Sequence, residues 1–173
     1  MLVFAGMEND AAAERAAKLR ALQDYFAESS ATALEMLAPN ALSKANASRG
    51  TQLIINSHAD VNHFAGMNAK SLYDKLVSKG LENGAFQSLY LIACEAGQRN
   101  RKGVIVGNFA HDLNSVFKQN QVDIALYAPR GAVTYAVQTF TQDGVSNCEV
   151  ANIMIHSPER DYPLSRGMLR VII

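Results

Sequence analysis

Two residues capable of nucleophilic chemistry follow two apolar segments of the sequence. His58 comes after "TQLIIN" (51–56), and Cys94 comes after "SLYLIA" (88–93). A cysteine thiol is only slightly ionised at neutral pH, and a neighbouring imidazole that takes its proton makes the sulfur a nucleophile. The two residue types therefore predict covalent thiol chemistry, provided that the fold brings the side chains together.

The elements that must position this pair alternate along the chain. Short apolar runs predict strands at 2–6, 51–56, 88–93 and 122–128. Apolar residues at helical spacing predict helices between these strands, the first of them with Asp10 as its N-cap. Such alternation is typical of a parallel sheet with crossover helices on both faces.

Two further segments depart from this alternation. Residues 31–37 predict a short second helix. Residues 132–155 are rich in β-forming residues on both sides of Asp143 and Gly144, a pair that favours a tight turn, so they predict a β-hairpin beside the main sheet. The expected fold class is a single three-layer α/β/α domain over residues 1–173, with a mainly parallel sheet, a C-terminal β-hairpin and a final strand.

The expected sheet brings His58 and Cys94 to one edge. Both follow the carboxyl ends of predicted neighbouring strands, where functional residues of open α/β sheets gather. Taken alone, a cysteine is more often a small core residue, and a histidine after a strand is more often a loop or cap residue. Their joint placement favours the functional interpretation.

Composition restricts the partners. Sixteen basic and sixteen acidic side chains cancel, so the chain lacks the field that draws proteins to nucleic acid or anionic membranes. The apolar start at 1–7 is too short for a signal peptide or a spanning segment. Cys94 and Cys148 are too few for a disulfide scaffold, and the chain shows neither a zinc motif nor a nucleotide-binding motif. We therefore expect no metal and no cofactor.

A family resemblance rests on four segments. "QLIINSHAD" and "LYLIACEAG" resemble the caspase-like (clan CD) cysteine peptidases, in which one apolar strand ends in His-Gly and the next ends in a small residue followed by Cys. "GNFAHDLNSVF" and "VDIALYAPRGAV" resemble the following helix and strand of bacterial members, especially the self-cleaving peptidase domains of large toxins and related effector or CHAT-type domains. The resemblance covers roughly residues 51–135.

The resemblance implies a cysteine endopeptidase with a catalytic dyad. Cys94 would be the nucleophile and His58 its general base or imidazolium partner, while the backbone N–H groups of Ala59 and Cys94 would form the oxyanion site. It also implies a protein of the cytoplasm, or one secreted into a host cell as an effector. Because Ala59 replaces the usual glycine, a catalytically silent protein-interaction module is a second hypothesis. A flavodoxin-like domain with Cys94 in its core is a third.

Two loops bear on the substrate and on regulation. Arg130, with Gly131 beside it, is the candidate substrate-binding site for an acidic residue, and a solvated loop arginine is the alternative. An extended peptide could add to a strand edge near "APRGAV". The basic residues 99–102, "RNRK", suit either a small anionic activator such as an inositol phosphate or a solvated loop. The expected partner is a peptide or protein substrate.

Overall fold

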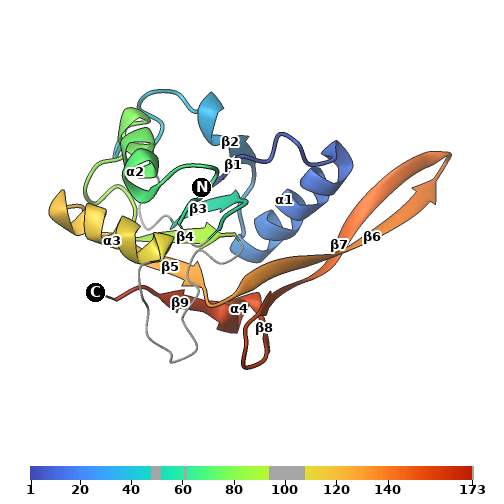
Figure 1. Cartoon of the computed structure of the whole chain (residues 1–173). Coiled ribbons are helices and arrows are strands. Elements are labelled where there is room, and N and C mark those ends of the chain that lie inside the picture. Colours follow the sequence, from blue (N-terminus) through green and yellow to red (C-terminus); the bar gives the residue numbers. More distant parts are fainter. Residues whose placement is uncertain (48–51, 61, 94–107, 173) are drawn as a thin grey trace.

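A six-stranded sheet forms the centre of the computed structural model, which describes residues 1–47, 52–60, 62–93 and 108–172 (Figure 1). Its strand order is β2-β1-β3-β4-β5-β9, and every neighbouring pair is parallel except β5 and β9. The mainly parallel sheet of an α/β protein is thus confirmed. The strands are β1 (Leu2–Ala5), β2 (Ala31–Ala33), β3 (Gln52–Ser57), β4 (Ser88–Ile92), β5 (Ala125–Pro129) and β9 (Met168–Arg170).

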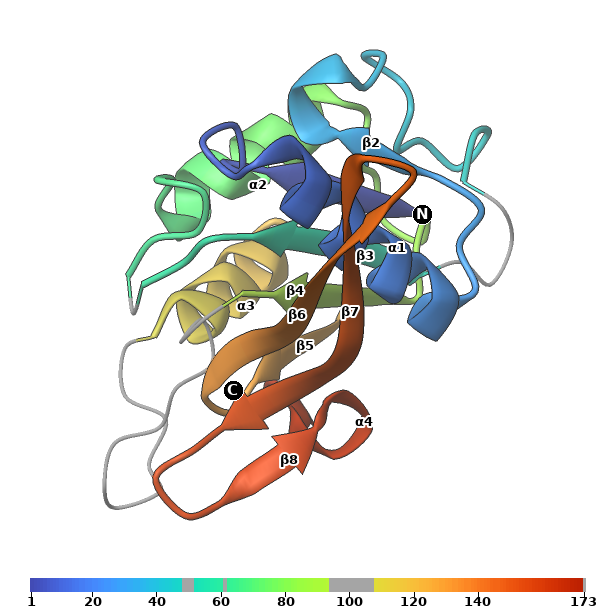
Figure 2. The ribbon, with the colours of Figure 1, turned by 90° about the vertical axis from the view of Figure 1, so that its right-hand side faces the viewer.

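Helices cover both faces of this sheet (Figures 1 and 2). Successive residues of a strand point to opposite faces: Ile55 packs in the core beneath α2 and α3, and Ile54 packs in a second core with Leu22 of α1. The sheet therefore separates two apolar cores. The helices are α1 (Ala12–Phe26), α2 (Ala69–Ser78), α3 (Phe109–Gln119) and the short α4 (Leu164–Gly167).

Side-chain caps begin two of these helices. Asn68 accepts a hydrogen bond from the backbone N–H of Ser71 at the start of α2, and Asn108 accepts one from His111 at the start of α3, both at 2.9 Å. The predicted cap of α1 is wrong. Ala11 occupies the N-cap position without a side-chain hydrogen bond, because the carboxylate of Asp10 contacts a histidine and a lysine described below.

The predicted helix at 31–37 is also wrong. Residues Ala31–Ala33 form β2, which pairs in parallel with β1, and Leu34–Met36 form one turn of 3-10 helix. The helix-forming tendency of alanine and leucine is small per residue, and the hydrogen bonds along the edge of the sheet outweigh it here.

A three-stranded antiparallel sheet packs beside the central one. It contains β6 (Ala132–Gln142), β7 (Val145–His156) and β8 (Asp161–Pro163) in that order. The segment expected to form a hairpin supplies β6 and β7, which turn at Asp143 and Gly144, both with positive φ. These two strands form a long ribbon that runs across α1 (Figure 2), where Arg20 donates a hydrogen bond to the carbonyl of Cys148 at 3.1 Å.

Candidate functional site

His58 lies directly after β3, at the carboxyl edge of the sheet. The pairing of β3 with β4 runs from Gln52 opposite Ser88 to Asn56 opposite Ile92, so the two strands end level with each other. Cys94 follows Ile92 by two residues in the sequence, but it lies outside the described residues. The structure thus places His58 where β4 ends, while the pairing of His58 with Cys94 stays a prediction.

A carboxylate that the sequence did not indicate holds His58. Asp10, from the loop between β1 and α1, places its Oδ1 atom 2.8 Å from Nε2 of the imidazole. The Asp10 side chain is only 12% exposed, whereas His58 is 61% exposed. An ionised carboxylate only accepts hydrogen bonds, so Nε2 carries the proton and Nδ1 of the neutral ring keeps its lone pair. The ring is therefore oriented as a base.

The charge of Asp10 is stabilised on two sides. Burial raises the pKa of this carboxyl group, but the hydrogen bond from His58 and the positive charges of His58 and Lys18 outweigh it, so the pKa lies below its ordinary value. Lys18 Nζ lies 3.5 Å from Oδ2, too long for a well-formed hydrogen bond, and it also pairs with Glu14 at 2.7 Å. Asp10 is consequently ionised at neutral pH.

A pocket of about 290 Å³ opens beside His58 and is called the His58 pocket below. The ends of β3 and β4, the first half of α1 and the start of β6 form its walls. Tyr135 of β6 donates a hydrogen bond to the buried side chain of Asn56 at 3.0 Å, which ties the ribbon to the sheet at this point. The lining residues are Met7, Glu14, Lys18, Asn56, Ser57, His58, Ile92, Ala93, Val133, Thr134 and Tyr135.

Ala59 can serve an oxyanion site despite its side chain. It forms an isolated antiparallel bridge with Phe64, and its φ is not among the positive values of the described residues. A Cβ atom therefore causes no backbone strain at this position. Among the described residues, none accepts a hydrogen bond from the N–H group of Ala59.

Asp60 belongs to the adjoining turn rather than to the His58 pocket. Its carboxylate accepts hydrogen bonds from the backbone N–H groups of Asn62 and His63, at 2.7 and 2.8 Å. These two hydrogen bonds lower the pKa of Asp60. Its side chain contacts the ring of His63, not that of His58. The acidic partner of His58 is thus Asp10, which lies 48 residues earlier in the chain.

The proposed substrate-binding residues make contacts within the fold. The Arg130 guanidinium lies over the ring of Tyr162 at 4.2 Å, and its backbone N–H donates to the carbonyl of Gly167 at 3.0 Å. A Cβ atom at Gly131 would lie 1.9 Å from the carbonyl oxygen of His156, so only glycine fits there. Neither residue lines the His58 pocket. Residues 99–102 lie outside the described residues.

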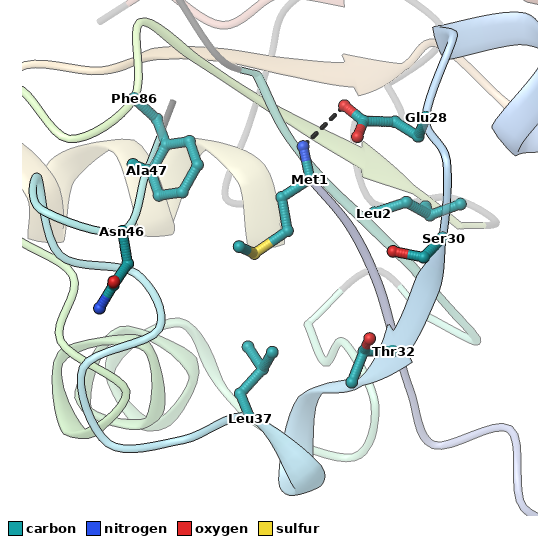
Figure 3. Close-up of a pocket in the computed structure, with 9 residues that line it drawn as sticks. All are labelled: Met1, Leu2, Glu28, Ser30, Thr32, Leu37, Asn46, Ala47 and Phe86. Atoms are coloured by element: carbon teal, nitrogen blue, oxygen red, sulfur yellow. Dashed lines mark hydrogen bonds and ion pairs between the residues drawn. The ribbon is translucent and has the colours of Figure 1, made fainter. Parts of the chain in front are cut away.

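A separate hollow of about 230 Å³ lies at the amino end of β1, away from the His58 pocket (Figure 3). Figure 3 shows Phe86 and Leu37 facing its open centre, with Glu28 turned toward the amino group of Met1. That ion pair measures 2.6 Å. The hollow presents no histidine or cysteine among its lining residues, so it offers no nucleophile or imidazole base.

Comparisons with protein-family models, with curated proteins and with solved structures found no match. No helix in the described part of the chain is long and apolar enough to cross a membrane. The described residues contain no cluster of three or more His, Cys, Asp or Glu side chains that could hold a metal ion.

Proposed function

We propose that this chain is a cysteine peptidase of the caspase-like type, with Cys94 as nucleophile and His58 as general base. The observation that supports this most is the imidazole of His58, which a buried and ionised carboxylate orients at the edge where β4 ends. Cys94 lies two residues beyond that end in the sequence. An imidazole next to a thiol increases its thiolate fraction and so its reactivity at neutral pH.

The reaction would proceed through an acyl-enzyme. The Cys94 thiol gives its proton to Nδ1 of His58, and the sulfur attacks the carbonyl carbon of the scissile peptide bond. The N–H groups of Ala59 and Cys94 stabilise the resulting oxyanion. His58 then protonates the leaving amine, the C–N bond breaks, and a water molecule hydrolyses the thioester.

Asp10 adds a third residue to the dyad that the resemblance implies. Its carboxylate holds the imidazole in one tautomer and stabilises the imidazolium that forms when His58 takes the thiol proton. The hydrogen bond and the burial of Asp10 both favour this role. Asp10 touches neither the substrate nor the sulfur in this scheme, so it is a positioning residue.

The substrate would bind as an extended peptide along β6. Its first residues line the His58 pocket, so a peptide lying along them would pass beside His58. Addition of an extended peptide to a sheet is a common mode of peptide recognition. The resemblance further implies an effector or self-processing domain, acting in the cytoplasm or in a host cell. A small anionic activator, for which the basic residues 99–102 are the candidate contact, belongs to the same proposal, and a solvated loop there is the alternative.

The direct test is the rate at which iodoacetamide alkylates Cys94 as a function of pH, followed by mass spectrometry. We expect alkylation below the ordinary thiol pKa in the unaltered chain and loss of this low-pH reactivity in His58→Ala. His63→Ala is the matched control, since His63 is an exposed histidine of the same loop. Identical pH profiles in all three proteins would reject the nucleophile assignment and leave the interaction module as the better hypothesis.

A further inference from the structure

A third pocket, of about 400 Å³, lies at the other end of α1 from the His58 pocket. Tyr25 and Phe26, in the last turn of α1, form one side of it, whereas Glu14 and Lys18 in the first half of α1 line the His58 pocket. We call it the aromatic pocket. Its lining residues are Tyr25, Phe26, Ala27, Gln52, Tyr90, Tyr127, Leu164, Ser165 and Met168.

Four aromatic rings form one continuous series along this pocket. Tyr25 meets Phe26 edge to face with ring centres 4.8 Å apart, and Phe26 lies 5.2 Å from Tyr90. Tyr90 of β4 stacks on Tyr127 of β5 at 4.7 Å with planes only 10° apart. Register explains the stack, because these two tyrosines are directly opposite each other in the parallel ladder. Neighbouring strands thus hold two parallel rings in fixed positions.

The chemistry of the lining selects against charged ligands. None of the nine lining residues is acidic or basic, and a charge moved from water into such a site would lose hydration without gaining a partner. Burial and the neighbouring Tyr127 raise the pKa of Tyr90, so this phenol stays neutral. Phenol hydroxyls and the Ser165 hydroxyl supply hydrogen bonds, while the amide of Gln52 already donates to the carbonyl of Phe26 at 3.0 Å.

The aromatic lining favours an aromatic ligand. The planes of successive rings are 78°, 56° and 10° apart, so the rings offer differently oriented contacts. A planar aromatic ring can meet them in offset or edge-to-face arrangement, whereas an aliphatic group of equal size lacks these ring–ring contacts. The pocket also falls in the size range of small-molecule sites, roughly 300–1,000 Å³.

We propose that the aromatic pocket is a binding site for a neutral planar ring, such as an indole or another uncharged heteroaromatic group of a small molecule. This proposal does not rest on the proposed peptidase function, because none of its residues lines the His58 pocket. The site therefore gives the chain a ligand-binding capacity separate from the thiol chemistry.

Indole is the probe for the test, with binding measured by calorimetry and by the change in the probe's own emission. The chain contains no tryptophan, so all indole emission comes from the probe. We expect saturable binding of indole with at least tenfold higher affinity than cyclohexanol, which is neutral but not flat, and than indole-3-acetate, which is flat but charged. Equal affinity for cyclohexanol or for indole-3-acetate would overturn the proposal.

Two substitutions locate the bound probe. Tyr127→Leu removes half of the stacked pair, and Tyr25→Ala removes a ring that is 47% exposed, so it leaves the core intact. We expect each to weaken indole binding at least fivefold, while Tyr73→Leu, on α2, and His58→Ala leave it unchanged. Unaltered affinity in Tyr25→Ala, or loss of binding in His58→Ala, would place the indole elsewhere and overturn the assignment.

Discussion

At the scale of single residues, Asp10 changes the interpretation of the site most. A histidine that is 61% exposed would ordinarily sample several orientations, but the buried carboxylate fixes its ring at 2.8 Å. The lone pair of Nδ1 is then available in the tautomer that a general base requires. Two predictions follow from this contact, one kinetic and one thermodynamic.

Replacing Asp10 by asparagine should slow the alkylation of Cys94 at neutral pH by roughly ten- to a hundredfold, since a hydrogen bond to a charged group contributes roughly 1.5–3 kcal/mol. The amide keeps the size of the side chain but no longer stabilises an imidazolium. Asp60→Asn is the control, because Asp60 contacts His63 instead. Equal slowing in both variants would show that the effect is a general change of charge near the sheet edge.

Asp10 should also contribute a pH-dependent part of the stability. Its pKa in the folded chain lies below the value of 3.8 that it has in an unfolded one. The contribution of Asp10 to the unfolding free energy is therefore fully present above pH 3.8. It is lost as the pH falls through the folded-state pKa. Urea unfolding should show that Asp10→Asn is less stable than the unaltered chain at neutral pH, by a margin that shrinks below pH 3.8. A constant margin would contradict the assigned ion pairs.

Gly131 is predicted to be intolerant of any side chain. A Cβ atom at this position would lie 1.9 Å from a backbone oxygen of His156, which cannot move without breaking the pairing of β6 with β7. Gly131→Ala should cost at least about 2 kcal/mol of unfolding free energy. Gly66→Ala meets no atom within 4 Å but has a φ of +71°, so it should cost only about 1 kcal/mol. Thermal unfolding of the two variants gives the comparison.

Sequence alone predicted His58 as a residue of the sheet edge, but it did not predict its partner. Asp10 follows the first strand, so its proximity to His58 depends on β1 lying beside β3 in the sheet. Strand order is set by packing between distant segments, and hydrophobic periodicity does not encode it. Tyr135 was missed for a related reason, since alternation along β6 does not show which strand of the sheet the phenol reaches.

At the scale of elements, hydrophobic spacing predicted the helices well, because a helix forms its backbone hydrogen bonds within its own segment. Helices α2 and α3 begin at asparagine caps and place their apolar faces against the sheet as the spacing predicts. The wrong predictions concern segments in which pairing with a distant strand outweighs the helix-forming tendency of the residues. Residues 31–37 have helix-forming composition, but the first three of them join the sheet as β2. Strand β8 has only three residues, too few to give a recognisable pattern.

The cap of α2 gives the test at this scale. Asn68→Ala removes the acceptor for the N–H of Ser71 and should lower the unfolding free energy by about 1 kcal/mol. Asn68→Ser keeps a capping oxygen and should retain most of that stability. Chemical denaturation of both variants measures the difference. If alanine and serine were equally destabilising, the loss would come from another contact of Asn68.

At the scale of the whole molecule, one sheet divides two cores that must form together. Leu72 of α2 and Leu22 of α1 are both fully buried, but they belong to the cores on opposite faces. The chain should therefore unfold in a single transition even when one core is weakened, because β1, β3 and β4 each contribute side chains to both cores.

Leu22→Ala and Leu72→Ala should each cost about 2–5 kcal/mol, and the double variant should equal their sum within roughly 0.5 kcal/mol. Circular dichroism in urea, followed at helical and aromatic wavelengths, measures both quantities. Separate transitions at the two wavelengths would show that the faces unfold independently.

The lengths of the outer strands have a consequence for self-association. The central sheet ends in β2 on one side and β9 on the other, and each has only three residues. Another copy of the chain finds few unpaired backbone groups at either end, so the sheet cannot easily template intermolecular growth. Among the described strands, β6 borders the smaller sheet, and an irregularity between Tyr135 and Val137 interrupts its regular pairing with β7. At high concentration, the central sheet is thus protected from aggregation by its own short borders.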